Sequence, residues 1–224
     1  MIQPARKHFD ELLSDLREQV MEMGSRAERM VGDAVKAVLK KDIPLAREVV
    51  DSDGILDRME LEIHSTAIVI IAREAPVAKD VRLIAAVMGI SSELERVGDD
   101  AVSIAKKAIT VPDEIPPDAA KELTELSEKA RGMLLKALKA FREDDPALSE
   151  EVIAEDAEVD ALWKRARRSV KDKIRNNPDF VDAGLKIIQA LHHLEYVGDR
   201  AVSIVERLEF VRTGNLVRFC RASF

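Results

Sequence analysis

The chain contains nearly the same helical segment twice. The stretch "LERVGDDAVSIA" at 94–105 returns as "LEYVGDRAVSIV" at 194–205, an offset of 100 residues. A second pair, "REVVDSDGILD" at 47–57 and "EEVIAEDAEVD" at 150–160, precedes it in each half at an offset of 103. Two matches in the same order at nearly equal offsets are hard to obtain by chance. The sequence therefore predicts one structural unit used twice.

Each unit is expected to be helical. Only nine glycines and eight prolines occur, and apolar residues recur at intervals near 3.6. Helices are predicted at about 6–39, from an Asp42 N-cap to before Pro76, from Pro76 to the segment "TVPDEIPPDAA", and at about 119–141, 147–174 and 180–211. The fold class predicted is all-α: two tandem three-helix bundles at 1–110 and 117–213, joined by the proline-rich segment and followed by a tail at 214–224.

Composition narrows the classes of function. The chain has 42 acidic against 35 basic residues, a net charge of −7, which argues against nucleic acid or an anionic membrane as the main partner. The longest apolar run, "TAIVIIA", is far shorter than the roughly 20 residues that a membrane span needs. The single cysteine, Cys220, allows no internal disulfide, and the first residues contain no apolar secretory signal. We expect a soluble, cytoplasmic protein with no direct membrane insertion.

Acidic residues recur in pairs four positions apart, which places both members of a pair on one face of a helix. The pairs are Asp53 with Asp57, Glu95 with Asp99, Asp156 with Asp160, and Glu195 with Asp199. Within each unit, both pairs lie about 24–35 Å from the hairpin that joins their helices, at a rise of about 1.5 Å per residue. The sequence therefore predicts four carboxylates at one height in each unit.

Such carboxylates repel one another, and burial makes ionised acids more costly. Pairing with Lys or Arg, protonation or cation binding could compensate. Lys106, Arg96 and Arg200 are near in sequence, but the two arginines are expected to point to other faces, which favours cations. Oxygen ligands suit magnesium, manganese, calcium or iron. The alternative is that the acids are ordinary surface charges in salt bridges. Gly98 and Gly198, inside the motifs, suggest either a close backbone approach or access to a site.

These motifs, with "APVAKDVR" at 75–82, resemble the PhoU family of phosphate-uptake regulators over roughly residues 8–212. The resemblance implies two three-helix bundles whose acidic motifs hold multinuclear metal clusters, with iron or zinc in some members. The ligands it implies are Asp53, Asp57, Glu95, Asp99, Asp156, Asp160, Glu195 and Asp199. Two features depart from the family: Ser103 and Ser203 stand where Asn or Asp is frequent, and "NPDFVDAGLK" is only a loose counterpart of "APVAKDVR".

The resemblance also implies a regulatory function. Such proteins report phosphate sufficiency from the phosphate ABC transporter to a sensor histidine kinase, and so keep phosphate-starvation genes off. We therefore expect contact with the transporter ATPase and the kinase, a homodimer and no enzyme activity.

Two alternatives stay open. One is a ferritin-like carboxylate-bridged metal oxidase, although that chemistry uses Glu-x-x-His and here His192 precedes Glu195. The other is a metal-free helical scaffold. His192 and His193 are expected at a boundary or surface, and Trp163 and Tyr196 in packing.

Overall fold

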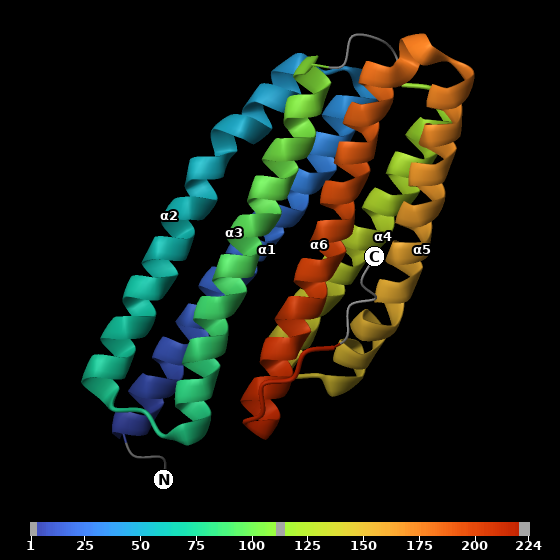
Figure 1. Ribbon diagram of the computed structural model, residues 1–224. Coiled ribbons are helices and arrows are strands. Elements are labelled where there is room, and N and C mark those ends of the chain that lie inside the picture. Colours follow the sequence, from blue (N-terminus) through green and yellow to red (C-terminus); the bar gives the residue numbers. More distant parts are fainter. Residues whose placement is uncertain (1–3, 111–114, 220–224) are drawn as a thin grey trace.

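The computed structural model describes residues 4–110 and 115–219, with side chains from Lys7 onward. Six long helices run antiparallel to their neighbours in the chain, as Figure 1 shows. They are α1 (Pro4–Lys40), α2 (Ile43–Glu74), α3 (Ala78–Thr110), α4 (Pro117–Glu143), α5 (Pro146–Asn176) and α6 (Val181–Thr213), with a short 3-10 helix, η1 (Pro178–Phe180), before α6. The prediction of an all-α fold made of two three-helix bundles is confirmed.

Local signals in the sequence set the helix ends. The Asp42 side chain accepts a hydrogen bond from the backbone N–H of Leu45 at 3.0 Å, and Asp145 accepts one from Ala147 at 2.8 Å. Each N-cap thus satisfies a backbone donor that the first helical turn leaves open. Gly214 ends α6 at a φ of 78°, in the left-handed region that glycine adopts without strain. The predicted helix boundaries lie close to the observed ones for this reason.

The two bundles share one continuous apolar core. Leu16 of α1, Leu56 of α2 and Ile90 of α3 are buried in the first bundle, and Leu123 and Leu194 in the second. The bundles meet through α3 against α6 and through α1 against α4, and Figure 1 shows α3 and α6 side by side at the centre. The predicted linker lies partly at 111–114, outside the described residues, as does Cys220.

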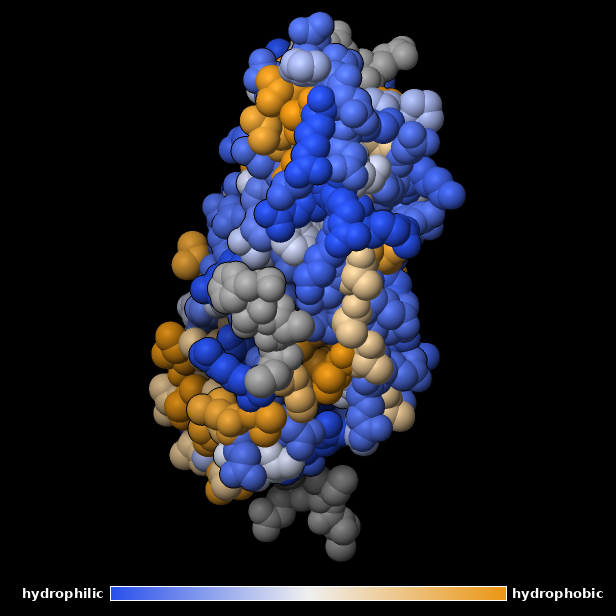
Figure 2. Space-filling view, turned by 45° about the vertical axis from the view of Figure 1, so that its right-hand side comes forward, coloured by the Kyte–Doolittle hydropathy of each residue, from blue (hydrophilic) through white to orange (hydrophobic). Residues whose placement is uncertain are grey.

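The face of the molecule drawn in Figure 2 is mostly hydrophilic. Figure 2 shows scattered apolar residues that gather toward the end of the molecule where α6 ends. Over the described part of the chain, no helix has a stretch apolar and long enough to cross a bilayer.

Candidate functional site

Glycines bring neighbouring helices together beside the acidic motifs. A Cβ added to Gly98 of α3 would lie 2.4 Å from a methyl group of Leu56 on α2. At the equivalent place in the second bundle, a Cβ on Gly198 of α6 would lie 3.2 Å from Val159 of α5. The predicted close approach at both glycines is therefore present. It brings the acidic faces of paired helices toward each other.

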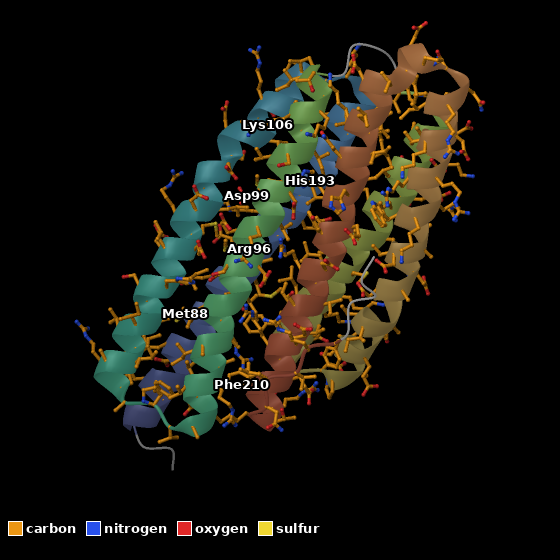
Figure 3. The ribbon with its side chains drawn as sticks, in the orientation of Figure 1. Met88, Arg96, Asp99, Lys106, His193 and Phe210 are labelled. Carbon is orange, nitrogen blue, oxygen red and sulfur yellow. The ribbon has the colours of Figure 1, made fainter. Side chains whose placement is uncertain are left out.

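In the first bundle the four carboxylates act on one another across α2 and α3. Burial, followed by the negative charges of Asp99 and Asp57, raises the pKa of Asp53. Burial also raises the pKa of Glu95 to about 7, with Asp99, Glu60 and Asp57 adding to the effect. The pKa of Asp99 is raised by burial and then by Asp100 and Asp57. We name Asp53, Asp57, Glu95 and Asp99 the first acidic cluster; Asp99 is labelled in Figure 3.

In the second bundle the equivalent residues of α5 and α6 also converge. Burial raises the pKa of Glu195 to about 7, and the charges of Asp199, Asp160 and Asp156 raise it further in that order. The Glu195 side chain is only 16% exposed. These four acids form the second acidic cluster. The structure thus brings together all eight acids in two groups of four, as the helix register predicts.

The two clusters differ in the residues that adjoin them. In the first bundle the Ser92 hydroxyl donates to Glu60 Oε1 at 2.6 Å, so a fifth carboxylate adjoins the cluster. The repeat offsets place Trp163 and His192 at these positions in the second bundle, where their rings lie 5.6 Å apart. The first cluster therefore has a polar neighbour where the second has an aromatic one.

His192 borders the second cluster. Its Nδ1 lies 3.2 Å from Glu195 Oε2, and neither atom has a hydrogen-bond partner among the described residues. Burial, followed by the charges of His193 and Arg167, lowers the pKa of His192 and favours the neutral imidazole. Its ring packs between Trp163 and Tyr196 at centroid distances of 5.6 and 4.2 Å, so those two aromatics have the expected packing role.

Few positive charges face the clusters. Lys106 lowers the pKa values of Asp53 and Asp99, and Lys164 lies 3.3 Å from Asp160 in the second cluster. The nearby arginines, Arg96 and Arg200, lie 3.5 Å from Glu93 of α3. Arg96 also lowers the pKa of Glu95, and Arg200 lowers that of Asp99. Burial and the neighbouring acids outweigh these positive charges and raise the pKa values of Glu95 and Glu195 to about 7, so these two glutamates take up protons more readily than usual.

The donor set suits a cation that prefers oxygen ligands, such as magnesium, manganese or iron. The unpartnered atoms of Glu195 and His192 fit such an ion in the second cluster. Among the described side chains, however, no three Asp, Glu, His or Cys groups converge closely enough to hold a metal ion as they stand. A bound cation would require the carboxylates to turn toward a common point.

A second polar centre, which the sequence analysis missed, lies between the bundles. Glu93 and Asp100 of α3 are 5% and 6% exposed, respectively. Glu93 faces Arg200 of α6, while Asp100 Oδ1 lies 2.8 Å from His193 Nδ1, labelled in Figure 3. In the internal repeat, position 93 corresponds to position 193, and position 100 corresponds to position 200. The partner of each acid therefore stands at the position equivalent to the other acid. The sequence signals this centre through a change of residue type: the acids at 93 and 100 correspond to a histidine and an arginine at 193 and 200.

The serines that replace the family's Asn or Asp show one local contact. Ser203 donates a hydrogen bond from its hydroxyl to the Asp199 carbonyl of its own helix at 3.1 Å. Such back-bonding is common for serine in helix interiors.

The family assignment follows from comparison with known proteins. The profile of the PhoU domain family matches residues 20–108 and 123–208, once in each bundle. A relative from Rhizobium meliloti, described as a phosphate-specific transport system accessory protein PhoU homolog, is 34% identical over 92% of this chain and 87% of its own length. A relative of the same description from Pseudomonas aeruginosa is 33% identical over 95% of this chain and 88% of its own length.

Solved structures agree with the fold. The crystal structure of PhoU from Pseudomonas aeruginosa superposes with a TM-score of 0.88 at 33% identity, covering 92% of this chain and all of that one. The phosphate transport system regulatory protein PhoU from Streptococcus pneumoniae shares the fold, with a TM-score of 0.88 at 23% identity over 94% of this chain and all of that one. The two matched repeats, the relatives and the shared fold agree: the chain belongs to the PhoU family.

Proposed function

We propose that this protein is an accessory regulator of a phosphate ABC transporter. The observation that carries the proposal is the match to relatives described as phosphate-specific transport system accessory proteins, which extends over both repeats at about one-third identity. In this role the protein contacts the transporter ATPase and a sensor histidine kinase in the cytoplasm. It keeps the phosphate-starvation response off when phosphate is plentiful, and it acts by contact rather than by catalysis.

The test of this role is affinity capture from cells grown with plentiful phosphate. The tagged chain should recover the transporter ATPase, the sensor kinase or both, and deletion of its gene should switch on phosphate-starvation genes in phosphate-rich medium. An unrelated helical protein with the same tag is the control. Recovery of neither partner, together with an unchanged transcriptional response after deletion, would contradict the proposal. Light scattering of the purified chain tests the proposed homodimer.

We also propose that the two acidic clusters hold metal ions, with iron, zinc, manganese or magnesium as candidates. The support is the convergence of four carboxylates in each bundle, where burial and the neighbouring acids raise the pKa values of Glu95 and Glu195 to about 7. The metal would neutralise this charge and fasten α2 to α3 and α5 to α6, while the protein residues supply oxygen ligands and a glycine-spaced helix contact.

Elemental analysis of the purified protein tests the metal proposal. The double variant Asp99→Asn, Asp199→Asn removes one carboxylate from each cluster and should lose most of the bound metal. The matched control is Asp15→Asn with Glu18→Gln, which removes two exposed charges from α1 and should retain the metal. Absence of metal from both proteins would favour the metal-free scaffold alternative, and equal metal content in both would show that the two clusters do not hold the ion.

One observation is compatible with the oxidase alternative. The contact of His192 with Glu195 places a neutral imidazole beside a carboxylate cluster, as an iron centre could use. Oxygen consumption on addition of ferrous iron distinguishes the two functions: a regulator should consume oxygen no faster than the buffer, whereas an oxidase should turn over repeatedly.

A further inference from the structure

A groove of about 850 Å³ lies between α3 and α6, on the joint between the bundles rather than within either acidic cluster. The segment after α6 forms one wall, because Leu216–Phe219 line the groove and the Phe219 N–H donates to Glu206 Oε1 at 2.8 Å. Charged side chains dominate the lining. They are Arg96, Arg200, Arg207 and Arg218, with Glu93 and Glu206.

The groove carries a surplus of positive charge. Three guanidinium groups share the single carboxylate of Glu93, at 3.5 Å from Arg96, 3.5 Å from Arg200 and 3.2 Å from Arg207. One negative charge therefore faces three positive ones. Counted over the lining alone, four arginines face two glutamates, a surplus of two positive charges. Arg96 and Arg200 also interact with Glu95 and Asp99, which lie outside the lining. Asp100, the other buried acid of α3, is occupied by His193.

The arginines also have hydrogen-bonding capacity to spare. The Nε atoms of Arg200 and Arg207 are buried and have no acceptor among the described residues, and Glu93 Oε2 in the same lining has no donor there. Buried N–H groups without an acceptor are destabilising, and most buried donors in folded proteins have one. Room for Arg207 is made by Gly89 of α3, where an added Cβ would lie 2.2 Å from its Nη1. The helix backbone is thus shaped to admit this guanidinium.

We propose that the groove binds a divalent tetrahedral oxyanion, either free phosphate or the phosphate group of a monoester. A phosphate group carries about −1.5 to −2 charges near neutral pH, which matches the surplus. Its oxygens accept several charge-assisted hydrogen bonds, and the planar guanidinium fork binds such oxygens in pairs. The groove is large enough for the group and open enough for it to enter. This site goes beyond the proposed function, since it depends neither on the transporter nor on bound metal.

Isothermal titration of the full chain tests the proposal, with EDTA present so that metal in the acidic clusters cannot bind the anion. Inorganic phosphate should bind saturably, whereas sodium chloride at equal ionic strength should not. A parallel titration with adenosine monophosphate distinguishes the sources: tighter binding of phosphate assigns the site to the free ion, and tighter binding of the nucleotide assigns it to an ester.

Variants connect binding to the groove. Arg96→Gln with Arg207→Gln should weaken phosphate binding about ten-fold or more, because it removes two charge-assisted donors. Gly89→Ala should weaken binding without changing any charge, by displacing the Arg207 guanidinium. The matched control is Arg47→Gln with Arg73→Gln, two exposed arginines of α2, which should bind like the unaltered protein.

The opposite change gives an independent readout. Glu93→Gln removes the carboxylate that competes for the guanidinium groups and should tighten phosphate binding several-fold; thermal melting confirms that the variant is folded. The proposal is overturned if the unaltered chain shows no saturable phosphate binding, if chloride gives the same response, if the α2 control weakens binding as much as the groove variants, or if folded Glu93→Gln binds phosphate more weakly.

Discussion

Glu195 should make the stability of the metal-free protein depend on pH. Its pKa is raised from 4.5 to about 7 in the folded state, first by burial and then by the neighbouring acids of its cluster. The folded protein therefore holds a proton that the unfolded chain releases near pH 4.5. The part of the free energy of unfolding that depends on this proton is fully present below pH 4.5 and is lost as pH rises through about 7. The pKa difference corresponds to on the order of 3 kcal/mol for this largely buried side chain.

The substitution Glu195→Gln keeps the shape of the side chain but removes its charge. The free energy of unfolding of the variant, relative to the unaltered protein, should rise by on the order of 3 kcal/mol between pH 4.5 and pH 8.5. That change corresponds to a relative gain of roughly 6–12 °C in the melting temperature for a chain of this size.

Urea unfolding followed by helical circular dichroism, with EDTA present, measures this difference across the pH range. The control is Glu150→Gln, an exposed site on α5, whose difference from the unaltered protein should stay constant with pH. The reasoning is refuted if the Glu195→Gln difference is also constant, or if it moves in the opposite direction as pH rises.

Three further predictions concern packing and hydrogen bonds, each checked by urea unfolding. Gly98→Ala should destabilise the protein by about 1–3 kcal/mol, because its methyl group would enter the space of a buried leucine, whereas Gly132→Ala, with open space around it, should stabilise it by up to about 1 kcal/mol; equal effects would contradict the close approach. A double-mutant cycle of Asp100→Ala and His193→Ala should give a coupling energy of about 1 kcal/mol, and a value near zero would show that their contact contributes nothing. Asp145→Ala should cost about 1 kcal/mol through loss of the α5 N-cap, and an unchanged midpoint would argue against that cap.

The helices and the acidic clusters could be predicted because both depend on short-range information. Asp42 and Asp145 signal helix starts within a few residues of sequence, and the four-residue spacing of the acids fixes the face on which they lie. Counting residues from each hairpin then sets their height, because antiparallel helices have a constant rise. Two helices and one turn were sufficient to place Asp53 near Asp99.

The centre between the bundles could not be predicted in the same way. Which face of α3 meets α6 depends on how two complete bundles pack, and no local pattern distinguishes Glu93 from an ordinary surface acid. The same holds for Glu60, whose place beside the first cluster depends on a contact with Ser92 from another helix. The segment after α6 has no periodic apolar pattern, so its position over the α3–α6 groove was also hidden.

The exchanged pairs at the joint have a consequence for how chains can assemble. If two first bundles docked in the way that α3 docks on α6, Glu93 of each would oppose Asp100 of the other, and like charges would meet. Two second bundles would set His193 against Arg200. Only a first bundle combined with a second brings opposite partners into register. The two halves are therefore not self-complementary at this joint, which disfavours the pairing of like halves from neighbouring chains.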